Sequence, residues 1–178
     1  MDYQLTKPEL REEKIKREEF KKQKRNEIYI VLDSLKVAHN VGTILRLADS
    51  VLAKKVYICG NTIVPPNKKI KTSSRGAERW VDWEYNESAV SVVKKLKEEN
   101  IKIVCVEVTK DSINYKDLKV SKEDKICIIL GREYDGVSQE LINLADVSVK
   151  LPLLGMSNSI NVSTCASVVL YEILSKLI

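Results

Sequence analysis

From residue 28 onward, short apolar runs alternate with stretches whose apolar residues recur at helical spacing. The apolar runs are rich in β-branched residues, as the central strands of parallel sheets are. This alternation predicts an α/β fold, in which a mostly parallel sheet carries helices on both faces. The predicted strands are 28–32, 55–59, 101–108, 126–130 and 147–151. The predicted helices are 41–52, 87–99, 138–145 and a C-terminal helix capped by Ser159 or Asn161.

One long connection, residues 61–86, interrupts the alternation. It contains Pro65, Pro66, Gly76 and both tryptophans, and we expect it to be irregular. Long connections in compact domains are often functional.

Composition limits the domain organisation. The chain has 178 residues, of which 44% are hydrophobic, so it is long enough for one full core and too short for two. Residues 27–178 should form that domain. No apolar run approaches the roughly 20 residues of a membrane span, and the N-terminus is charged where a signal peptide would be apolar. We therefore expect a cytoplasmic protein with no membrane partner.

Residues 1–26 differ in composition and are expected to form a charged helical arm. They hold nine lysines and arginines against six acidic residues, which is +3 of the net charge of +5. Acidic residues four positions before basic ones, such as Glu12 before Lys16, support an exposed helix. Two interpretations remain open, a solvated helix or an arm that binds RNA phosphates. The basic cluster in the arm is Lys21, Lys22, Lys24 and Arg25.

Cysteine and histidine usage argues against a metal site. The four cysteines lie far apart without a C-x-x-C pair, and His39 is the single histidine. Buried thiols are the simpler interpretation. The cysteines are Cys59, Cys105, Cys127 and Cys165.

The first candidate motif, HNVGTILRLADS at residues 39–50, follows the first predicted strand. Its apolar residues form one buried helix face, which turns Arg46 outward beside Asp49. Arg46 is interpreted either as an i,i+3 partner of Asp49 or as a functional cation. Asn40 is placed as the N-cap of this helix.

The second motif, LGREYDGVS at residues 130–138, also follows an apolar strand. Its two glycines suggest a phosphate-binding loop, but Val137 stands where that loop needs lysine, so nucleoside triphosphate binding is rejected. The absence of G-x-G-x-x-G after any strand also argues against a dinucleotide fold. We expect a turn at which backbone approaches something closely, with Glu133 either in solvent or functional.

The third motif is the C-terminal segment, residues 151–178. Small polar residues around Ser159 lead from the last strand into an amphipathic helix. A helix start at the carboxyl end of a sheet is a common ligand site in α/β proteins. The predicted buried face of the helix is Val162, Cys165, Val169, Ile173 and Leu177.

Together, the three motifs resemble those of the SpoU (TrmH-like) family of RNA ribose 2′-O-methyltransferases in the SPOUT superfamily. The likeness covers residues 28–178 and consists of N-x-G-x-x-x-R at 40–46, L-G-x-E-x-x-G at 130–136 and L-P-x-x-G-x-x-x-S-I-N-V-S at 151–163. The sequence departs from the commonest pattern only by conservative apolar changes, at Leu151, Leu153 and Ile160.

The resemblance implies a C-terminal deep trefoil knot, one of the rare exceptions to unknotted topology. It also implies S-adenosylmethionine as cofactor and a homodimer. The cofactor-binding residues carried over by position are Val106, Glu107, Leu130, Gly131, Leu151, Leu153 and Ile160.

The resemblance further implies that Arg46 lies nearest the acceptor ribose and is supplied across the dimer. The other catalytic-site residues carried over are Asn40, Glu133, Ser159 and Asn161. The alternative is a catalytically inactive RNA-binding or dimeric scaffold with the same fold. Many members of this family that act on rRNA carry an extra N-terminal RNA-binding domain, and the 26-residue arm lacks the core that such a domain needs. The resemblance therefore implies tRNA before rRNA as the substrate.

Overall fold

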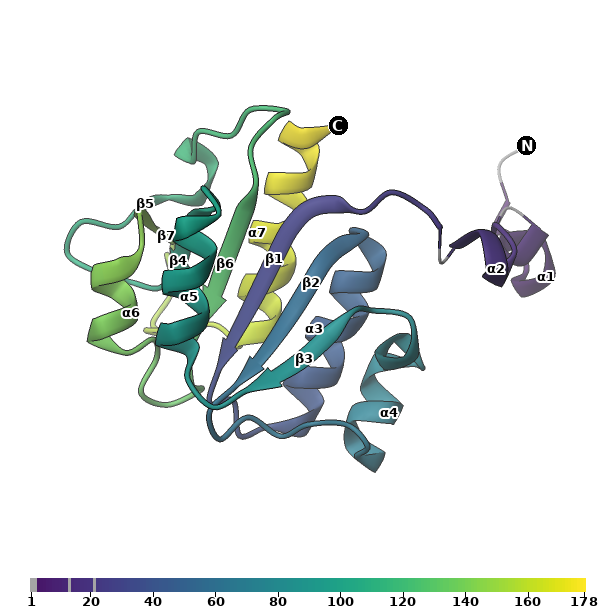
Figure 1. The fold of residues 1–178 in the computed structure, drawn as a ribbon, viewed down its shortest axis with the longest axis horizontal. Helices are drawn as coiled ribbons and strands as arrows, with labels where there is room; N and C mark the ends of the chain where they lie inside the picture. Colours follow the sequence, from purple (N-terminus) through teal and green to yellow (C-terminus); the bar gives the residue numbers. More distant parts are fainter. Residues whose placement is uncertain (1–2, 13, 21) are drawn as a thin grey trace.

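The computed structural model describes residues 3–12, 14–20 and 22–178, and its centre is a seven-stranded parallel sheet (Figure 1). The strand order is β3-β2-β1-β6-β4-β7-β5, and every neighbouring pair is parallel. The α/β prediction is confirmed. The strands are β1 Asn26–Asp33, β2 Ala53–Cys59, β3 Trp83–Asn86, β4 Lys102–Val106, β5 Ile113–Asn114, β6 Ile126–Leu130 and β7 Val147–Lys150.

Helices cover both faces of the sheet. Figure 1 shows α5 and α6 on the near face and α3 and α7 on the far face. The domain helices are α3 Ala38–Ser50, α4 Lys68–Ser74, η1 Ala77–Arg79, α5 Ala89–Glu98, η2 Tyr115–Asp117, α6 Gln139–Leu144 and α7 Val162–Leu177.

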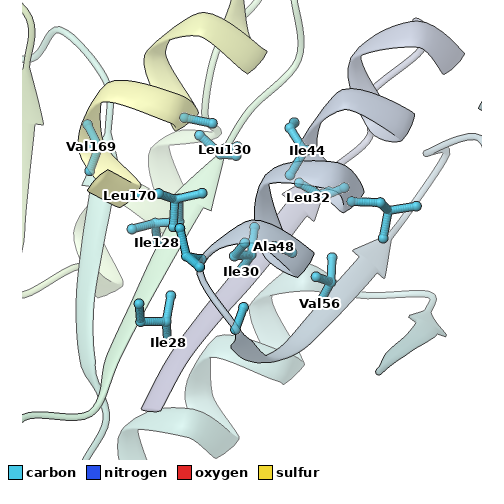
Figure 2. Close-up of a cluster of buried hydrophobic side chains, with 14 of the residues drawn as sticks. Ile28, Ile30, Leu32, Ile44, Ala48, Val56, Ile128, Leu130, Val169 and Leu170 are labelled. Carbon is cyan, nitrogen blue, oxygen red and sulfur yellow. The ribbon is translucent and has the colours of Figure 1, made fainter. Parts of the chain in front are cut away.

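Alternate residues of β1 supply two separate cores. Ile28, Ile30 and Leu32 are fully buried on the side of α3 and α7, where Figure 2 shows them beside Ile44 and Leu170. Tyr29 and Val31 face the other way, into the cluster that contains the buried residues of α5. A strand buried on both faces has no polar positions, which explains why these strands read as continuous apolar runs. Each such side chain stabilises the fold by about 1.5–3 kcal/mol.

The prediction of an irregular connection over 61–86 was wrong. This segment contains α4, η1 and the edge strand β3. Asn67 caps α4 by accepting hydrogen bonds from the amides of Lys69 and Ile70 at 2.9 and 3.3 Å. The helix buries only Ile70 and Ser74, so its sequence carries too few apolar positions to show a helical period.

The buried face of α7 is shifted from the predicted one. Val169 and Ile173 are buried as expected, but Val162, Cys165 and Leu177 are only half-buried. Small residues, Ser163 and Ala166, occupy the buried face together with Leu170. A prediction from apolar residues alone therefore misplaced the buried face of α7, because small residues lie where this helix packs most closely against the rest of the domain.

Four thiols occupy the predicted kinds of position. Cys59, Cys105 and Cys127 are buried in strands, and Cys165 is half-buried in α7. Burial raises the pKa of Cys59 and of Cys105 to about 12, which leaves both thiols protonated at neutral pH.

The arm contains two short helices, α1 Lys7–Glu12 and α2 Arg17–Phe20, in place of the single exposed helix predicted. It projects away from the sheet (Figure 1), and α1 buries no residue. Lys21 of the predicted basic cluster lies outside the described residues. Among the described residues, no helix is both long enough and apolar enough to cross a membrane.

Candidate functional site

The carboxyl ends of β4, β6 and β7 surround a pocket of about 430 Å³. β4 lies between β6 and β7 in the sheet, so residues distant in sequence meet at this edge. The seven residues carried over as cofactor contacts all line the pocket. They are Val106, Glu107, Leu130, Gly131, Leu151, Leu153 and Ile160.

Apolar side chains and a folded loop form the walls of the pocket. Val106 and Leu130 end their strands, whereas Leu151, Leu153 and Ile160 come from the segment that joins β7 to α7. Ile160 is 38% exposed and lies at the opening. Pockets of this size with apolar walls and exposed backbone polar groups are suited to a flat heterocycle.

Gly131 lies where the chain approaches itself closely, as expected of a glycine in this turn. A Cβ at this position would overlap the backbone of Gly136 and Val137. The loop folds back there, and Arg132 and Gly136 exchange backbone hydrogen bonds of 3.0 and 3.1 Å. Gly136 has a φ of 68°, a conformation that favours glycine.

Glu107 connects the end of β4 to this loop. Its carboxylate accepts hydrogen bonds from the amide of Val137 at 3.0 Å and from the amide of Val108 at 2.8 Å. The side chain therefore has a structural contact besides its place in the pocket lining.

Glu133 stabilises the start of α3. Val37, the N-cap residue of α3, has no side-chain cap, and the Glu133 carboxylate accepts hydrogen bonds from the amides of Lys36 and Val37 and from the Asn40 side chain, at 3.0–3.1 Å. Partial burial would raise the pKa of Glu133, but these hydrogen bonds outweigh it and hold the pKa below its ordinary value. The prediction of Asn40 as an N-cap was wrong, because α3 begins two residues earlier at Ala38.

Asn40 joins Glu133 to Asn161. Its amide group donates to Glu133, and its carbonyl oxygen accepts from the Asn161 amide at 3.0 Å. Since an ionised carboxylate can only accept, the orientations of both asparagine amides follow from it. Asn161 must then present its oxygen to the amide of Ser163, at 2.9 Å, and so caps α7 as predicted. Asn40 is 3% exposed, so this chain of hydrogen bonds fixes two helix starts against one loop.

Ser159 and Arg46 lie apart from this network. Ser159 lines the pocket and is exposed. Arg46 is exposed on α3, does not line the pocket of its own chain, and forms no ion pair with Asp49. Within the described residues, the geometry thus gathers Asn40, Glu133 and Asn161 and leaves Arg46 outside.

The pocket also contains residues that the sequence did not identify. Lys150 precedes the third motif, Asn158 lies inside it, and Cys165 lies one turn into α7. Partial burial, and then the carboxylate of Glu107, raise the pKa of the Cys165 thiol. Their positions beside or within the motifs were the only sign in the sequence that they line the pocket, because none of these residue types indicates a site by itself.

Comparison with known proteins places the chain among RNA-modifying enzymes. The model of the SpoU rRNA Methylase family matches residues 27–171. A tRNA (guanosine(18)-2′-O)-methyltransferase from Aquifex aeolicus (strain VF5) is 28% identical over 165 residues, which cover 90% of this chain and 75% of that protein. The enzyme of the same name from Escherichia coli (strain K12) is 26% identical, over 82% of this chain and 62% of the longer relative.

Solved structures have the same fold. The crystal structure of the A. aeolicus TrmH/SpoU tRNA modifying enzyme aligns with a TM-score of 0.79 and 26% identity, over 89% of this chain and 81% of that one. The SpoU methyltransferase AviRb from Streptomyces viridochromogenes, in complex with the cofactor AdoMet, aligns with a TM-score of 0.76 and 22% identity. That alignment covers 86% of this chain and 58% of AviRb.

Proposed function

This chain belongs to the SpoU rRNA methylase family of RNA ribose 2′-O-methyltransferases, and from that membership we propose that it methylates a ribose 2′-hydroxyl of tRNA with S-adenosylmethionine. The observation that carries the proposal is the pocket at the ends of β4, β6 and β7. All seven residues expected to hold the cofactor line this one pocket, although they come from three separate segments of the chain.

The residues of the pocket fit such a cofactor. Val106, Leu151 and Leu153 offer apolar surface to an adenine ring, and the backbone of loop 131–136 offers polar groups at the edge. Bound S-adenosylmethionine would supply an electrophilic methyl group. The protein must then hold an RNA ribose in line with that group and exclude competing geometries, and positioning of this kind can supply much of a rate enhancement.

Arg46 is the residue proposed to act on the RNA. A guanidinium stays protonated in proteins, so Arg46 would bind phosphate and lower the pKa of the attacking hydroxyl by its charge. Asn40, Glu133 and Asn161 would hold the start of its helix in register with the pocket loops. Ser159, exposed in the pocket lining, would contact the ribose.

We propose a homodimer in which Arg46 serves the pocket of the partner chain. Arg46 does not line its own pocket. Large apolar side chains in the pocket loop and in the segment after β7 are almost fully exposed, and exposed apolar groups of this kind mark contact surfaces. They are Tyr134 at 97%, Leu154 at 98% and Met156 at 100%.

The segment after β7 is proposed to form the trefoil knot. This segment and the loop 131–136 line the same pocket, so the two lie side by side, as such a knot requires. An experimental structure with continuous density from Lys150 to α7 tests it.

Among RNAs, tRNA is proposed as the substrate before rRNA. The relatives from A. aeolicus and E. coli are named as enzymes of tRNA guanosine 18, and that nucleotide is the first to test. The described part of the arm supplies no buried core for a separate RNA-binding domain.

Transfer of labelled methyl groups from S-adenosylmethionine to bulk tRNA and bulk rRNA tests the function. Nucleoside analysis by mass spectrometry should detect a 2′-O-methylated product in tRNA, and Arg46→Ala should abolish it. Cofactor binding without methyl transfer to either RNA would favour the inactive scaffold. Mapping the 2′-O-methyl groups lost on gene deletion then identifies the nucleotide.

Mixed dimers test the shared site. Leu153→Trp should fill the pocket from an exposed segment, and calorimetry should first confirm that it no longer binds the cofactor. Random pairing of Arg46→Ala with Leu153→Trp subunits gives half mixed dimers, each with one complete site, so activity should return to about a quarter of wild type. A mixture that stays inactive after demonstrated subunit exchange would exclude a site shared across the dimer.

A further inference from the structure

A second groove, of about 600 Å³, lies between α4, η1 and the edge strand β3. It is built from other elements than the pocket at β4, β6 and β7. Pro65 and Pro66 supply apolar surface, Trp83 lines one side, and Lys68 and Lys71 lie along α4. Both lysines are exposed.

Three basic residues, Lys68, Lys71 and Arg79, line this groove together with one acidic residue, Glu78. Residues 67–80 contain five basic residues against one carboxylate, that of Glu78, which accepts a hydrogen bond from Ser74. The five are Lys68, Lys69, Lys71, Arg75 and Arg79. Outside this segment and the N-terminal arm, sixteen basic residues face eighteen acidic ones. The net positive charge of the protein therefore comes entirely from these two segments.

The two basic segments adjoin in space. Arg25, at the root of the arm, donates a hydrogen bond to the carbonyl oxygen of Trp80 at 3.1 Å. Its guanidinium also lies 4.6 Å from the centre of the Phe20 ring. In Figure 1 the arm and α4 lie on the same side of the domain, the side of edge strand β3. A polyanion on this side would meet both.

The groove combines cations with a fixed aromatic ring. The indole of Trp83 donates from Nε1 to the carbonyl oxygen of Glu78 at 3.0 Å, which holds the ring beside η1. Arg79, which also lines the groove, lies over the ring of Trp80 at 5.8 Å. An aromatic ring for a base and cations for the flanking phosphates are the features that bind single-stranded nucleic acid.

We propose that this groove, together with the arm, is a second RNA-contact site that binds an unpaired nucleotide away from the methyl-transfer pocket. The base stacks on Trp83, and Lys68, Lys71 and Arg79 contact the phosphates beside it. The inference rests on the proposed function for its choice of RNA as ligand. It adds a site for substrate recognition that takes no part in the chemistry.

The first test compares the salt dependence of binding to a single-stranded RNA of about 12 nucleotides, within the usual size of such sites. The variant Lys68→Ala/Lys71→Ala is compared with Lys94→Ala/Lys95→Ala, which removes two exposed lysines from α5 on the other face of the sheet. Loss of two phosphate contacts should lower the slope of log K against log salt by about 1.4. The α5 variant should match wild type, and equal slopes for the two variants would overturn the proposal.

The second test uses the fluorescence of Trp83. The protein has two tryptophans, so Trp80→Phe leaves Trp83 as the single reporter. Stacking of a base should quench its emission on titration with the same RNA, and Trp83→Leu should weaken binding about tenfold or more. A melting curve for Trp83→Leu verifies the fold. Unchanged emission at saturating RNA would show that no base reaches the ring.

These measurements separate the groove from the proposed reaction. RNA binding is measured without S-adenosylmethionine, and cofactor affinity should be the same in all variants. If methyl transfer persists and both lysine variants bind RNA equally, the proposed RNA site in the groove is refuted and the proposed methyltransferase activity stands. If RNA binding depends on the groove but no methyl group is transferred, the proposed methyltransferase activity is refuted and the RNA site in the groove stands.

Discussion

The side-chain amide of Asn40 donates to Oε1 of Glu133 across 3.0 Å, and this hydrogen bond joins the first turn of α3 to the loop that follows β6. The same carboxylate accepts hydrogen bonds from the backbone amides of Lys36 and Val37. Glu133, 93 positions after Asn40, thus fixes the backbone immediately before α3, a helix that has no side-chain cap of its own. The pocket loop and the helix that carries Arg46 are therefore held as one unit.

Replacement of Glu133 should destabilise the domain. Glu133→Ala removes all three accepted hydrogen bonds and should lower the free energy of unfolding by about 1–3 kcal/mol, the usual cost of leaving partly buried donors without a charged acceptor. Glu133→Gln keeps one acceptor and should cost less. Urea unfolding measures both, with Asp135→Ala as the control, because Asp135 lies in the same loop and has only a long, exposed ion pair with Arg132. A control as destabilised as Glu133→Ala would contradict a stabilising role of these three hydrogen bonds.

The contribution of Glu133 should depend on pH. Its pKa in the folded protein is below the ordinary value of 4.5, so the carboxylate stabilises the fold above that value. The stabilisation is lost as the pH falls through the lowered pKa. The difference in unfolding free energy between wild type and Glu133→Gln, followed from about pH 7 to about pH 3, should therefore shrink. A constant difference would mean that charge plays no part.

Asn161 should show two separable effects. Serine can still cap α7 but cannot reach Asn40, so Asn161→Ser should cost about 1 kcal/mol for the lost hydrogen bond. Asn161→Ala also loses the cap and should cost about 1 kcal/mol more. In an Asn40→Ala background the first cost should vanish while the second remains. Equal costs in both backgrounds would show that the two asparagines are not coupled.

A methyl group at Gly131 should disrupt the loop rather than fill the pocket directly. Gly131→Ala would press Cβ against the backbone of Gly136 and Val137, which cannot move without breaking the Arg132–Gly136 pair. We expect a destabilisation of about 1–3 kcal/mol together with weaker cofactor binding. Calorimetry and thermal unfolding on the same sample measure the two. Weaker binding at unchanged stability would instead place the methyl group in the pocket.

Removal of residues 1–22 should affect RNA binding alone. The truncation keeps Arg25 and its hydrogen bond to Trp80, and α1 buries no residue, so the free energy of unfolding should change little. Loss of the basic residues should weaken RNA binding and flatten its salt dependence. Cofactor affinity serves as the control and should stay constant. An unchanged salt slope would leave the arm as a solvated segment.

The parts of the fold that the sequence predicted are those with a strong local pattern. Strands β1 and β6 are buried along most or all of their length, and their apolar runs were unmistakable. By contrast, α4 and β3 were missed because the first buries two residues and the second is a half-exposed edge strand. An element with few buried residues shows little hydrophobic periodicity in its sequence.

The sequence predicted which residues belong to the site, but it did not predict the contacts that they make. Motif resemblance grouped Asn40, Glu133 and Asn161, yet no local rule indicates that a carboxylate 93 residues later accepts a hydrogen bond from the Asn40 side chain. Gly42 makes the same point. A Cβ there would overlap Ser73 and lie 2.6 Å from the carbonyl oxygen of Ile70, so the glycine lets α4 pack against α3, a helix that the sequence did not predict. Contacts across the fold decide such residues.

Strand β1 lies inside the sheet, with a neighbour on each side, and this position affects how the chain folds while it is being synthesised. Its partner on one side is β2, but on the other side Ile28 pairs with Ile126 of β6. At ordinary translation rates, roughly 5 to 20 seconds separate the appearance of these two residues. Throughout that interval the nascent chain carries an apolar strand with one open edge, the kind of edge that promotes aggregation. A chaperone that covers β1 until β6 leaves the ribosome would therefore raise the yield of folded protein.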